Sequence, residues 1–130
     1  MTRSRYRIFE DFRPHFCTCT IVGWLPIFTR TEAVQLVLDS WKFLLEHERL
    51  QIYGYVILEN HLHFIASSAG RLGKEIGDFK SYTARRIIDR LETIGAGHLL
   101  QELAWRKARH KQDRDYQLAG GQPSGGDFQR

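Results

Sequence analysis

The 130-residue sequence has no long apolar run. A membrane-spanning helix needs about 18 or more consecutive apolar residues, and no segment approaches that length. The N-terminal segment MTRSRYRIFEDFRP carries charge but lacks the apolar stretch of about 7–15 residues that a signal peptide needs. We therefore expect a cytoplasmic protein with no membrane partner.

Cysteine is also scarce, with two in the chain, Cys17 and Cys19. They lie two positions apart in an apolar, strand-like segment, so their side chains point the same way and are not placed to close a loop. The CxxC and HxxxH spacings that are typical of structural zinc sites are absent from the sequence. We expect two buried, reduced thiols.

The overall composition is that of an ordinary globular protein, with 42% hydrophobic, 12% aromatic and 26% charged residues. A chain of this length forms one domain with its own hydrophobic core. The last segment, AGGQPSGGDFQR, is rich in Gly, Pro, Ser and Gln, a composition that predicts disorder. We therefore expect a folded domain at residues 1–118 and a disordered tail at 119–130.

Positive charge is concentrated in two places, although the whole chain carries a net charge of only +4. Arg71–Arg90 holds six basic residues against three acidic ones, and Arg106–Asp115 holds five against two. Such stretches favour a polyanionic partner such as nucleic acid. The alternative is a solvated helix face, which is also commonly charged.

Hydrophobic periodicity and turn residues divide the chain into elements. The Thr29–Glu32 segment has the spacing of a capping box before the first helix. The predicted elements are a strand at His15–Leu25, a helix at about Thr31–Arg49, a hairpin of Leu50–Leu58 and His61–Ser67, a helix from Leu72 to Leu91, a short helix at His98–Lys111 and a last strand at Asp115–Leu118.

This order predicts an α+β fold, specifically a ferredoxin-like βαββα(β) sandwich in which an antiparallel sheet has helices on one face. The last strand of that plan has to come from Asp115–Leu118, which is short. We expect Trp24 and Trp41 to lie in the core.

Two histidines separated by one residue carry the chemistry. On a strand, His61 and His63 project from the same face about 7 Å apart, while Leu62 points into the core. Paired imidazoles suit a divalent metal, which phosphoryl chemistry uses to polarise a phosphate oxygen. The alternative is two surface histidines that flank a core leucine.

The segment around these histidines is similar to a known family. Gly54–Ile65, GYVILENHLHFI, resembles the "YVIMPNHxHLL" motif of single-tyrosine HUH transposases, and Phe79–Ile87, FKSYTARRI, resembles the "FKxYTAR" helix of the REP-associated tyrosine transposase branch. The resemblance covers roughly His15 to Tyr116. It implies a ferredoxin-like domain that binds hairpins of palindromic DNA and cleaves the flanking single strand, with His61 and His63 as ligands of Mg²⁺ or Mn²⁺.

The nucleophilic tyrosine of that family has no match here. Family members carry it in a "YIHNNP"-like stretch after a "WQxG" strand, and neither motif is present. Tyr82 matches the non-nucleophilic helix motif. Tyr116 is a poor substitute, because a phenol with a pKa of about 10 must be held beside the metal to attack. The resemblance thus implies a truncated member with an unassigned catalytic residue, whose missing helix would also supply the third metal ligand.

The second predicted helix carries the candidate DNA-binding residues, which are Lys80, Tyr82, Arg85 and Arg86. Tyr82 and Arg86 are four positions apart and share a helix face, where one can stack on a base and the other can grip a phosphate. Packing at the shoulder of the helix is the alternative.

Three functions follow from these patterns. The first is a metal-dependent transposase that acts on hairpin or single-stranded DNA, as a monomer or a homodimer. The second is a catalytically dead module that still binds DNA hairpins. The third is a small metal-binding protein that uses His61 and His63 together with His15 or Cys17.

Overall fold

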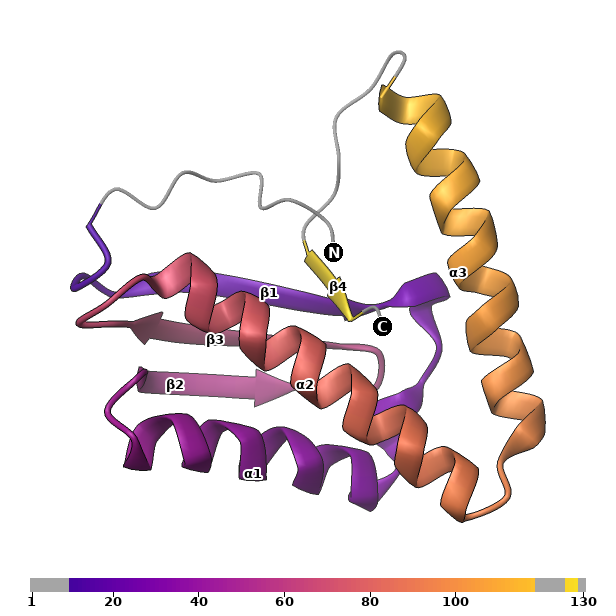
Figure 1. Cartoon of the computed structure of the whole chain (residues 1–130), viewed down its shortest axis with the longest axis horizontal. Helices are drawn as coiled ribbons and strands as arrows, with labels where there is room; N and C mark the ends of the chain where they lie inside the picture. Colours follow the sequence, from indigo (N-terminus) through magenta and orange to yellow (C-terminus); the bar gives the residue numbers. More distant parts are fainter. Residues whose placement is uncertain (1–9, 119–125, 129–130) are drawn as a thin grey trace.

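The computed structural model describes residues 10–118 and 126–128, and the side chains of residues 10–109. It combines a three-stranded antiparallel sheet with three helices (Figure 1). The strands and helices are β1 (His15–Ile21), α1 (Thr31–Glu46), β2 (Gln51–Ile57), β3 (His61–Ser67), α2 (Leu72–Thr93) and α3 (Gly97–Leu118), followed by a three-residue strand β4 (Gly126–Phe128). The α+β class is confirmed.

The strand order is β2-β3-β1-β4. The central strand β3 runs antiparallel to both β1 and β2, and the backbone N–H of Leu58 donates to the carbonyl of His61 (2.8 Å) to close the predicted hairpin. Strand β4 pairs in parallel with β1, whose edge offers backbone N–H and C=O groups that another strand can satisfy. Gly126–Phe128 falls within the expected tail at 119–130 and forms this strand, and the rest of 119–130 lies outside the described residues.

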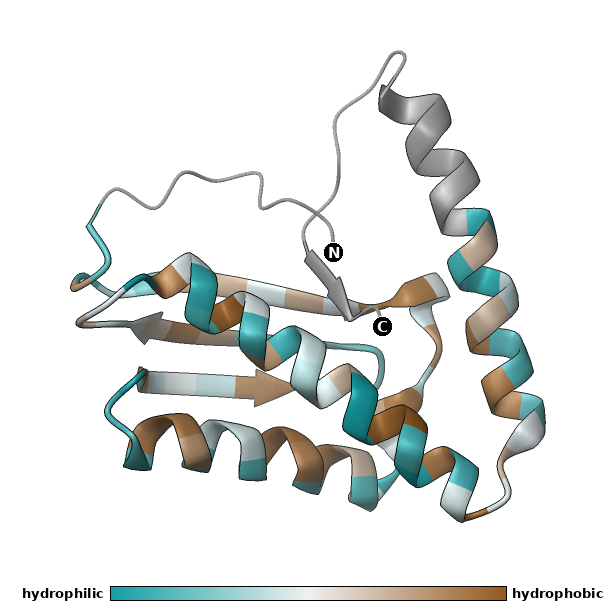
Figure 2. Ribbon diagram, viewed as in Figure 1, coloured by the Kyte–Doolittle hydropathy of each residue, from teal (hydrophilic) through white to brown (hydrophobic). Residues whose placement is uncertain are grey.

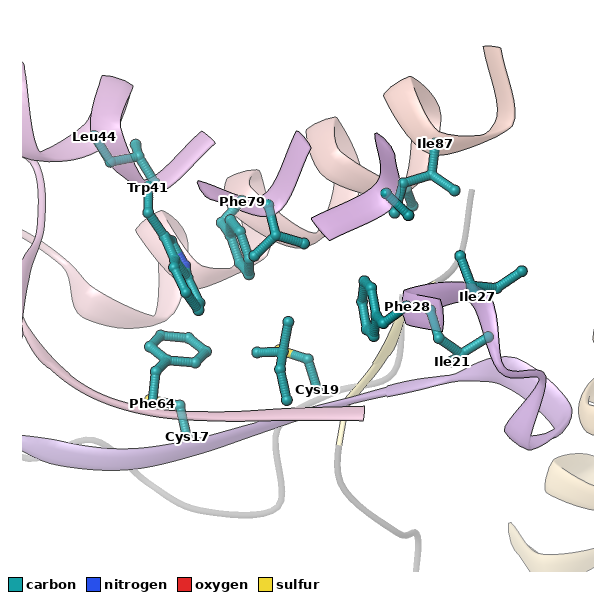
Figure 3. Close-up of a cluster of buried hydrophobic side chains, with 14 of the residues drawn as sticks. Cys17, Cys19, Ile21, Ile27, Phe28, Trp41, Leu44, Phe64, Phe79 and Ile87 are labelled. Atoms are coloured by element: carbon teal, nitrogen blue, oxygen red, sulfur yellow. The ribbon is translucent and has the colours of Figure 1, made fainter. Parts of the chain in front are cut away.

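One face of the sheet is buried under α1 and α2. Alternate strand residues point into this core, and Figure 3 shows Trp41 and Phe79 reaching from the helices toward Phe64 on β3. Hydrophobic and hydrophilic residues alternate along both helices (Figure 2), as an amphipathic helix requires. The buried hydrophobic residues of the strands are Cys17, Cys19, Ile21, Leu62, Phe64 and Ala66.

Polar contacts fasten the two helices to each other and to the N-terminal segment. The hydroxyl of Thr83 on α2 donates to that of Ser40 on α1 (2.9 Å). The first backbone N–H of α2, at Leu72, donates to the Asp11 carboxylate (2.8 Å). That carboxylate satisfies one of the backbone donors that every helix N-terminus leaves without an intrahelical partner.

The end of β1 differs from the expectation. The strand stops at Ile21 instead of Leu25, because Gly23 (φ 67°) and Trp24 (φ 58°) adopt left-handed backbone conformations that break the extended run. Trp24 is turned outward and is 64% exposed, so its expected place in the core is wrong. Trp41 is 2% exposed, as expected.

The helix α3 also differs from the expectation. It continues to Leu118, so the expected strand at Asp115–Leu118 is wrong. The segment QDRDYQL contains no β-branched residue, and this composition does not favour a strand. Gly95, in the left-handed region (φ 74°), separates α2 from α3. Among the described helices, none combines the length and the apolar character needed to cross a lipid bilayer.

Of two other local expectations, the one for the cysteines is confirmed and the one for the N-terminal cap of α1 is wrong. Cys17 and Cys19 are buried thiols outside any disulfide, as expected. The helix predicted from Thr31 is confirmed, but its capping box is not formed. The Thr29 hydroxyl donates to the carbonyl of Pro26 (2.7 Å) instead, and no side chain caps α1.

Candidate functional site

His61 and His63 lie on the sheet face that α1 and α2 do not cover. We call this surface the open face. Their ring centroids are 4.9 Å apart and the ring planes meet at 79°. The shared face predicted for the two histidines is confirmed, and Leu62 between them is fully buried. The strand residues of the open face include Phe16, Thr18, Thr20, Val56, His61, His63 and Ile65.

The orientation of His61 is set by the residue before it. The Nδ1 atom of His61 lies 2.7 Å from Oδ1 of Asn60. The amide nitrogen of Asn60 donates to the backbone carbonyl of Trp24 (3.4 Å), which fixes the oxygen toward the histidine. A carbonyl oxygen only accepts, so Nδ1 carries the proton, and the lone pair of a neutral imidazole lies on Nε2.

His63 is oriented by the neighbouring strand. Its Nδ1 atom lies 2.9 Å from the hydroxyl oxygen of Thr18, the residue that pairs with it across β1 and β3. A hydroxyl either donates or accepts, and when Nδ1 donates, the lone pair on Nε2 is available to a ligand. Metal-binding histidines typically use such a partner on the second ring nitrogen.

These donors make a partial metal site. Imidazole nitrogens suit transition metal ions, whereas Mg²⁺ prefers oxygen ligands. In the described part of the chain, no group of three or more His, Cys, Asp or Glu residues is placed to hold a metal ion. The residues present therefore fit a metal held by two histidines, with the remaining positions left to water, substrate or residues outside the described set.

Neither alternative ligand joins the pair. The Nε2 atom of His15 is hydrogen-bonded to the backbone carbonyl of Glu10 (3.0 Å). Cys17 lies on the core face of β1, on the opposite side of the sheet, and burial raises the pKa of its thiol to about 11. A protonated thiol is a poor metal ligand, because the thiolate is the binding form.

The structure does not bring the four candidate DNA-binding residues together with the histidines. All four lie on α2, which covers the other face of the sheet. Tyr82, Arg85 and Arg86 are exposed there. Lys80, in contrast, is 5% exposed and does not share the exposed surface of α2 with the other three residues. It lies one helical turn before the buried Thr83 and Ala84, on the inner side of α2.

Tyr82 and Arg86 line a groove between α1 and α2 with a volume of about 480 Å³. Phe43 and Arg49, which the sequence patterns did not single out, lie in the same groove. The Arg49 guanidinium donates to Glu75 (2.7 Å) and to Asp78 (2.9 Å).

The carboxylate of Asp78 also accepts a hydrogen bond from Lys74 (2.7 Å). That bond and the positive charges of Lys74 and Arg49 hold the pKa of Asp78 below its usual value. Arg49 is thus engaged by acids, which leaves Arg86 as the basic residue of the groove best placed to meet a phosphate.

The described tyrosine side chains lie away from the histidine pair. Tyr55 packs on Trp41 on the helix side of the sheet (ring centroids 5.1 Å apart), and Tyr82 lies on α2. The Tyr53 hydroxyl is hydrogen-bonded to Ser67 (2.9 Å). Tyr116 belongs to α3, and its side chain lies outside the described residues. The described side chains thus place no tyrosine nucleophile beside the histidines.

The hydrogen-bonding partners of His61 and His63 were not identified from the sequence. Asn60 stands next to His61 in the sequence, but its role depends on a contact with the Trp24 carbonyl. Thr18 is found only once the register of β1 against β3 is known.

The chain matches no protein-family model, no curated protein and no solved structure.

Proposed function

We propose that this chain is a DNA-binding protein of the single-tyrosine HUH transposase type, which uses His61 and His63 to act on the phosphate of a DNA single strand. The observation that carries the proposal is the histidine pair itself. The two rings share an exposed strand face and lie 4.9 Å apart, and each has a hydrogen-bonding partner at Nδ1.

The roles of the surrounding residues follow from these contacts. His61 and His63 would hold the metal through Nε2, and Asn60 and Thr18 keep the two rings turned toward it. Of the two ions expected, nitrogen donors favour Mn²⁺ over Mg²⁺. When bound, such an ion supplies a Lewis acid that polarises a phosphate oxygen.

The arrangement of elements supports the same proposal. The antiparallel strands β2-β3-β1 with α1 and α2 on one face agree with the first five elements of a ferredoxin-like plan. The end of the chain departs from that plan, because α3 is added after α2 and β4 pairs with β1 in parallel instead of antiparallel. Tyr82, Arg85 and Arg86 are exposed on α2 and would bind a DNA hairpin there. The single-stranded DNA that leaves the DNA hairpin would then have to pass around the edge of the β-sheet to reach the histidines on the open face.

A catalytically dead hairpin-binding module is the second candidate. It is favoured because the described side chains offer neither a tyrosine beside the histidines nor a third metal ligand. Without a nucleophile, a site can orient and polarise a phosphate but cannot form the covalent intermediate of strand transfer.

Calorimetric titration with Mn²⁺ tests the metal site. We expect heat of binding for the wild type and its loss in His61→Ala and in His63→Ala. His98→Ala is the matched control, since His98 is an exposed histidine on α3, and it should bind as the wild type does. Equal heats for all four proteins, or none for any, would contradict the proposal.

Denaturing electrophoresis with labelled oligonucleotides that span a palindromic repeat of the source genome separates the two candidates. We expect no covalent adduct in Mn²⁺, because the described side chains place no tyrosine beside the histidines, and this result would favour the second candidate. A labelled band that survives denaturation would support the active transposase instead. For the α2 surface, Arg85→Ala and Arg86→Ala should each lower the slope of log K against log salt by about 0.7–0.9.

A further inference from the structure

Two aromatic rings on the open face adjoin the histidine pair. The ring of Phe16 stacks on that of His63, with centroids 5.2 Å apart and planes inclined by 26°. The ring of Trp24 meets His61 edge-on, at 6.0 Å and 72°. Phe16 is nevertheless 69% exposed and Trp24 is 64% exposed. The contacts position both rings and leave most of their surface open to solvent.

The four rings follow the direction of β1. His63 pairs with Thr18 of β1 and His61 pairs with Thr20, and Phe16 lies two residues before Thr18. Trp24 follows the end of β1, beside His61. Each step of two residues along a strand is about 7 Å, so the order along the open face is Phe16, His63, His61 and Trp24.

The outward position of Trp24 is enforced by its surroundings. A bulky residue with positive φ is a conformational outlier, and here it follows Gly23, which is also left-handed. Arg106 of α3 donates to the carbonyl of Gly23 (2.7 Å), and Asn60 donates to that of Trp24 (3.4 Å). Backbone strain of this kind persists only where neighbours over-determine it, and it gathers at ligand sites.

The charge around these rings complements a nucleic acid. The open-face residues of β1, β2 and β3 include no acidic residue, and Asp127 of β4 pairs with Thr20 at the end of β1. Arg106 of α3 brings a positive charge to Gly23, although it also pairs with Glu102 (3.2 Å), and the Arg109 guanidinium on the same helix lies 5.1 Å from the ring of Trp105. Flat exposed rings beside positive charge are the combination that binds single strands, whose bases stack on aromatic side chains. In a duplex the bases are already stacked on one another.

We infer that Phe16 and Trp24 are base-stacking residues that flank the histidines, so that single-stranded DNA lies along β1 over the open face. The inference rests on the proposed function, because it supplies the site that presents a strand to His61 and His63. Stacking itself needs no metal, and this binding therefore persists when divalent ions are removed.

Fluorescence anisotropy of a labelled oligothymidylate in EDTA tests the inference. Phe16→Ala and Trp24→Ala should each weaken binding by about 5- to 150-fold, since one base stacked on an aromatic ring contributes about 1–3 kcal/mol. Trp24→Phe should keep most of the affinity, because it keeps a ring. Tyr55→Ala is the control, since Tyr55 is a 57% exposed ring on the helix side of the sheet and lies outside the groove between α1 and α2, and it should bind like the wild type.

Tryptophan fluorescence gives a second readout. Oligothymidylate should quench the emission of the wild type and of Trp105→Phe, whereas Trp24→Phe should lose most of the quenching. Trp41 is buried in both variants and contributes a constant background.

Three results would overturn the inference. The first is equal affinity of Phe16→Ala, Trp24→Ala and the Tyr55→Ala control. The second is equal binding of a matched duplex. The third is a wild-type dimer in sedimentation that Trp24→Ala dissociates, because the open face would then lie between two copies of the chain. In each case the proposed metal site is tested separately. Binding of Mn²⁺ at His61 and His63 would still support the proposed function, and a lack of Mn²⁺ binding would contradict it.

Discussion

The free energy of unfolding should fall in alkaline solution because a buried thiol has to ionise. Cys17 is 9% exposed, and burial raises the pKa of its thiol from 9.0 to about 11, although the charge of Lys80 acts in the opposite direction. Between these two pKa values the unfolded chain has lost the Cys17 proton and the folded chain has kept it. Unfolding then releases a proton and becomes more favourable as the pH rises.

The magnitude follows from the two pKa values. A shift of about 2 pKa units corresponds to a contribution of about 2.7 kcal/mol to the free energy of unfolding. This contribution is fully present below the pKa of Cys17 in the unfolded chain and is lost once the pH exceeds its pKa in the folded chain. At about pH 10, halfway between them, the loss is about 1.4 kcal/mol. This is measurable against a total stability of about 5–15 kcal/mol.

Urea unfolding of the wild type and of Cys17→Ala, at about pH 8 and about pH 10, isolates this contribution. The other ionisable groups are common to both proteins, so most of their contributions cancel in the difference. The stability advantage of the wild type should shrink by about 1.4 kcal/mol between the two conditions. If both proteins lose stability in parallel, Cys17 ionises as readily in the folded state as in the unfolded chain, and the burial argument is wrong.

Three further substitutions probe other contacts. Asn60→Ala should lower Mn²⁺ affinity by about 10- to 100-fold in calorimetry because His61 loses the acceptor for Nδ1–H, and an unchanged affinity would contradict that role. Gly23→Ala should lower the free energy of unfolding by at least about 1–2 kcal/mol, because φ is 67° and a Cβ would overlap the Arg106 side chain; urea unfolding measures it, and a neutral effect would contradict the close approach. Asp11→Ala should cost about 1 kcal/mol in the same assay, because the first turn of α2 loses an acceptor, whereas Asp11→Asn should retain most of the stability.

The elements with one buried face were predictable from the sequence. The range His61–Ser67 predicted for a strand is the range of β3, because a shift of one residue would turn the entire hydrophobic set toward solvent. The helix beginning at Thr31 was predictable for a similar reason, since its apolar residues recur at the helical period. The common face of His61 and His63 follows from the same alternation.

The turn after β1 was not predictable from local patterns. Apolar and aromatic residues continue to Leu25, and Gly23 is a weak local signal of a break, because an isolated glycine within a strand pattern is also compatible with a continuing strand. The turn is held by Arg106, which lies 83 positions later than Gly23. Such a long-range contact decides whether Trp24 is buried or exposed, and propensity does not report it.

The position of Lys80 was misjudged for another reason. Lysine is almost never fully buried without a partner, so its charge suggested the surface. The helical period carried the opposite signal, because Lys80 shares a face with Thr83, Ala84 and Ile87, all of them buried. Where charge and periodicity disagreed, periodicity predicted the side of the helix correctly.

The alternation along β3 ties the histidines to the core in a way that affects which sequence changes the protein tolerates. Replacing His61 or His63 alters an outward position and should leave the fold intact. Deleting the residue between them would shift the inward and outward alternation of β3 on one side of the deletion. An imidazole would then have to point into the apolar core, or Phe64 would have to point out of it. Single-residue deletions in His61–Ser67 should therefore abolish folding where substitutions of the histidines do not, and the site cannot drift along the strand in steps of one residue.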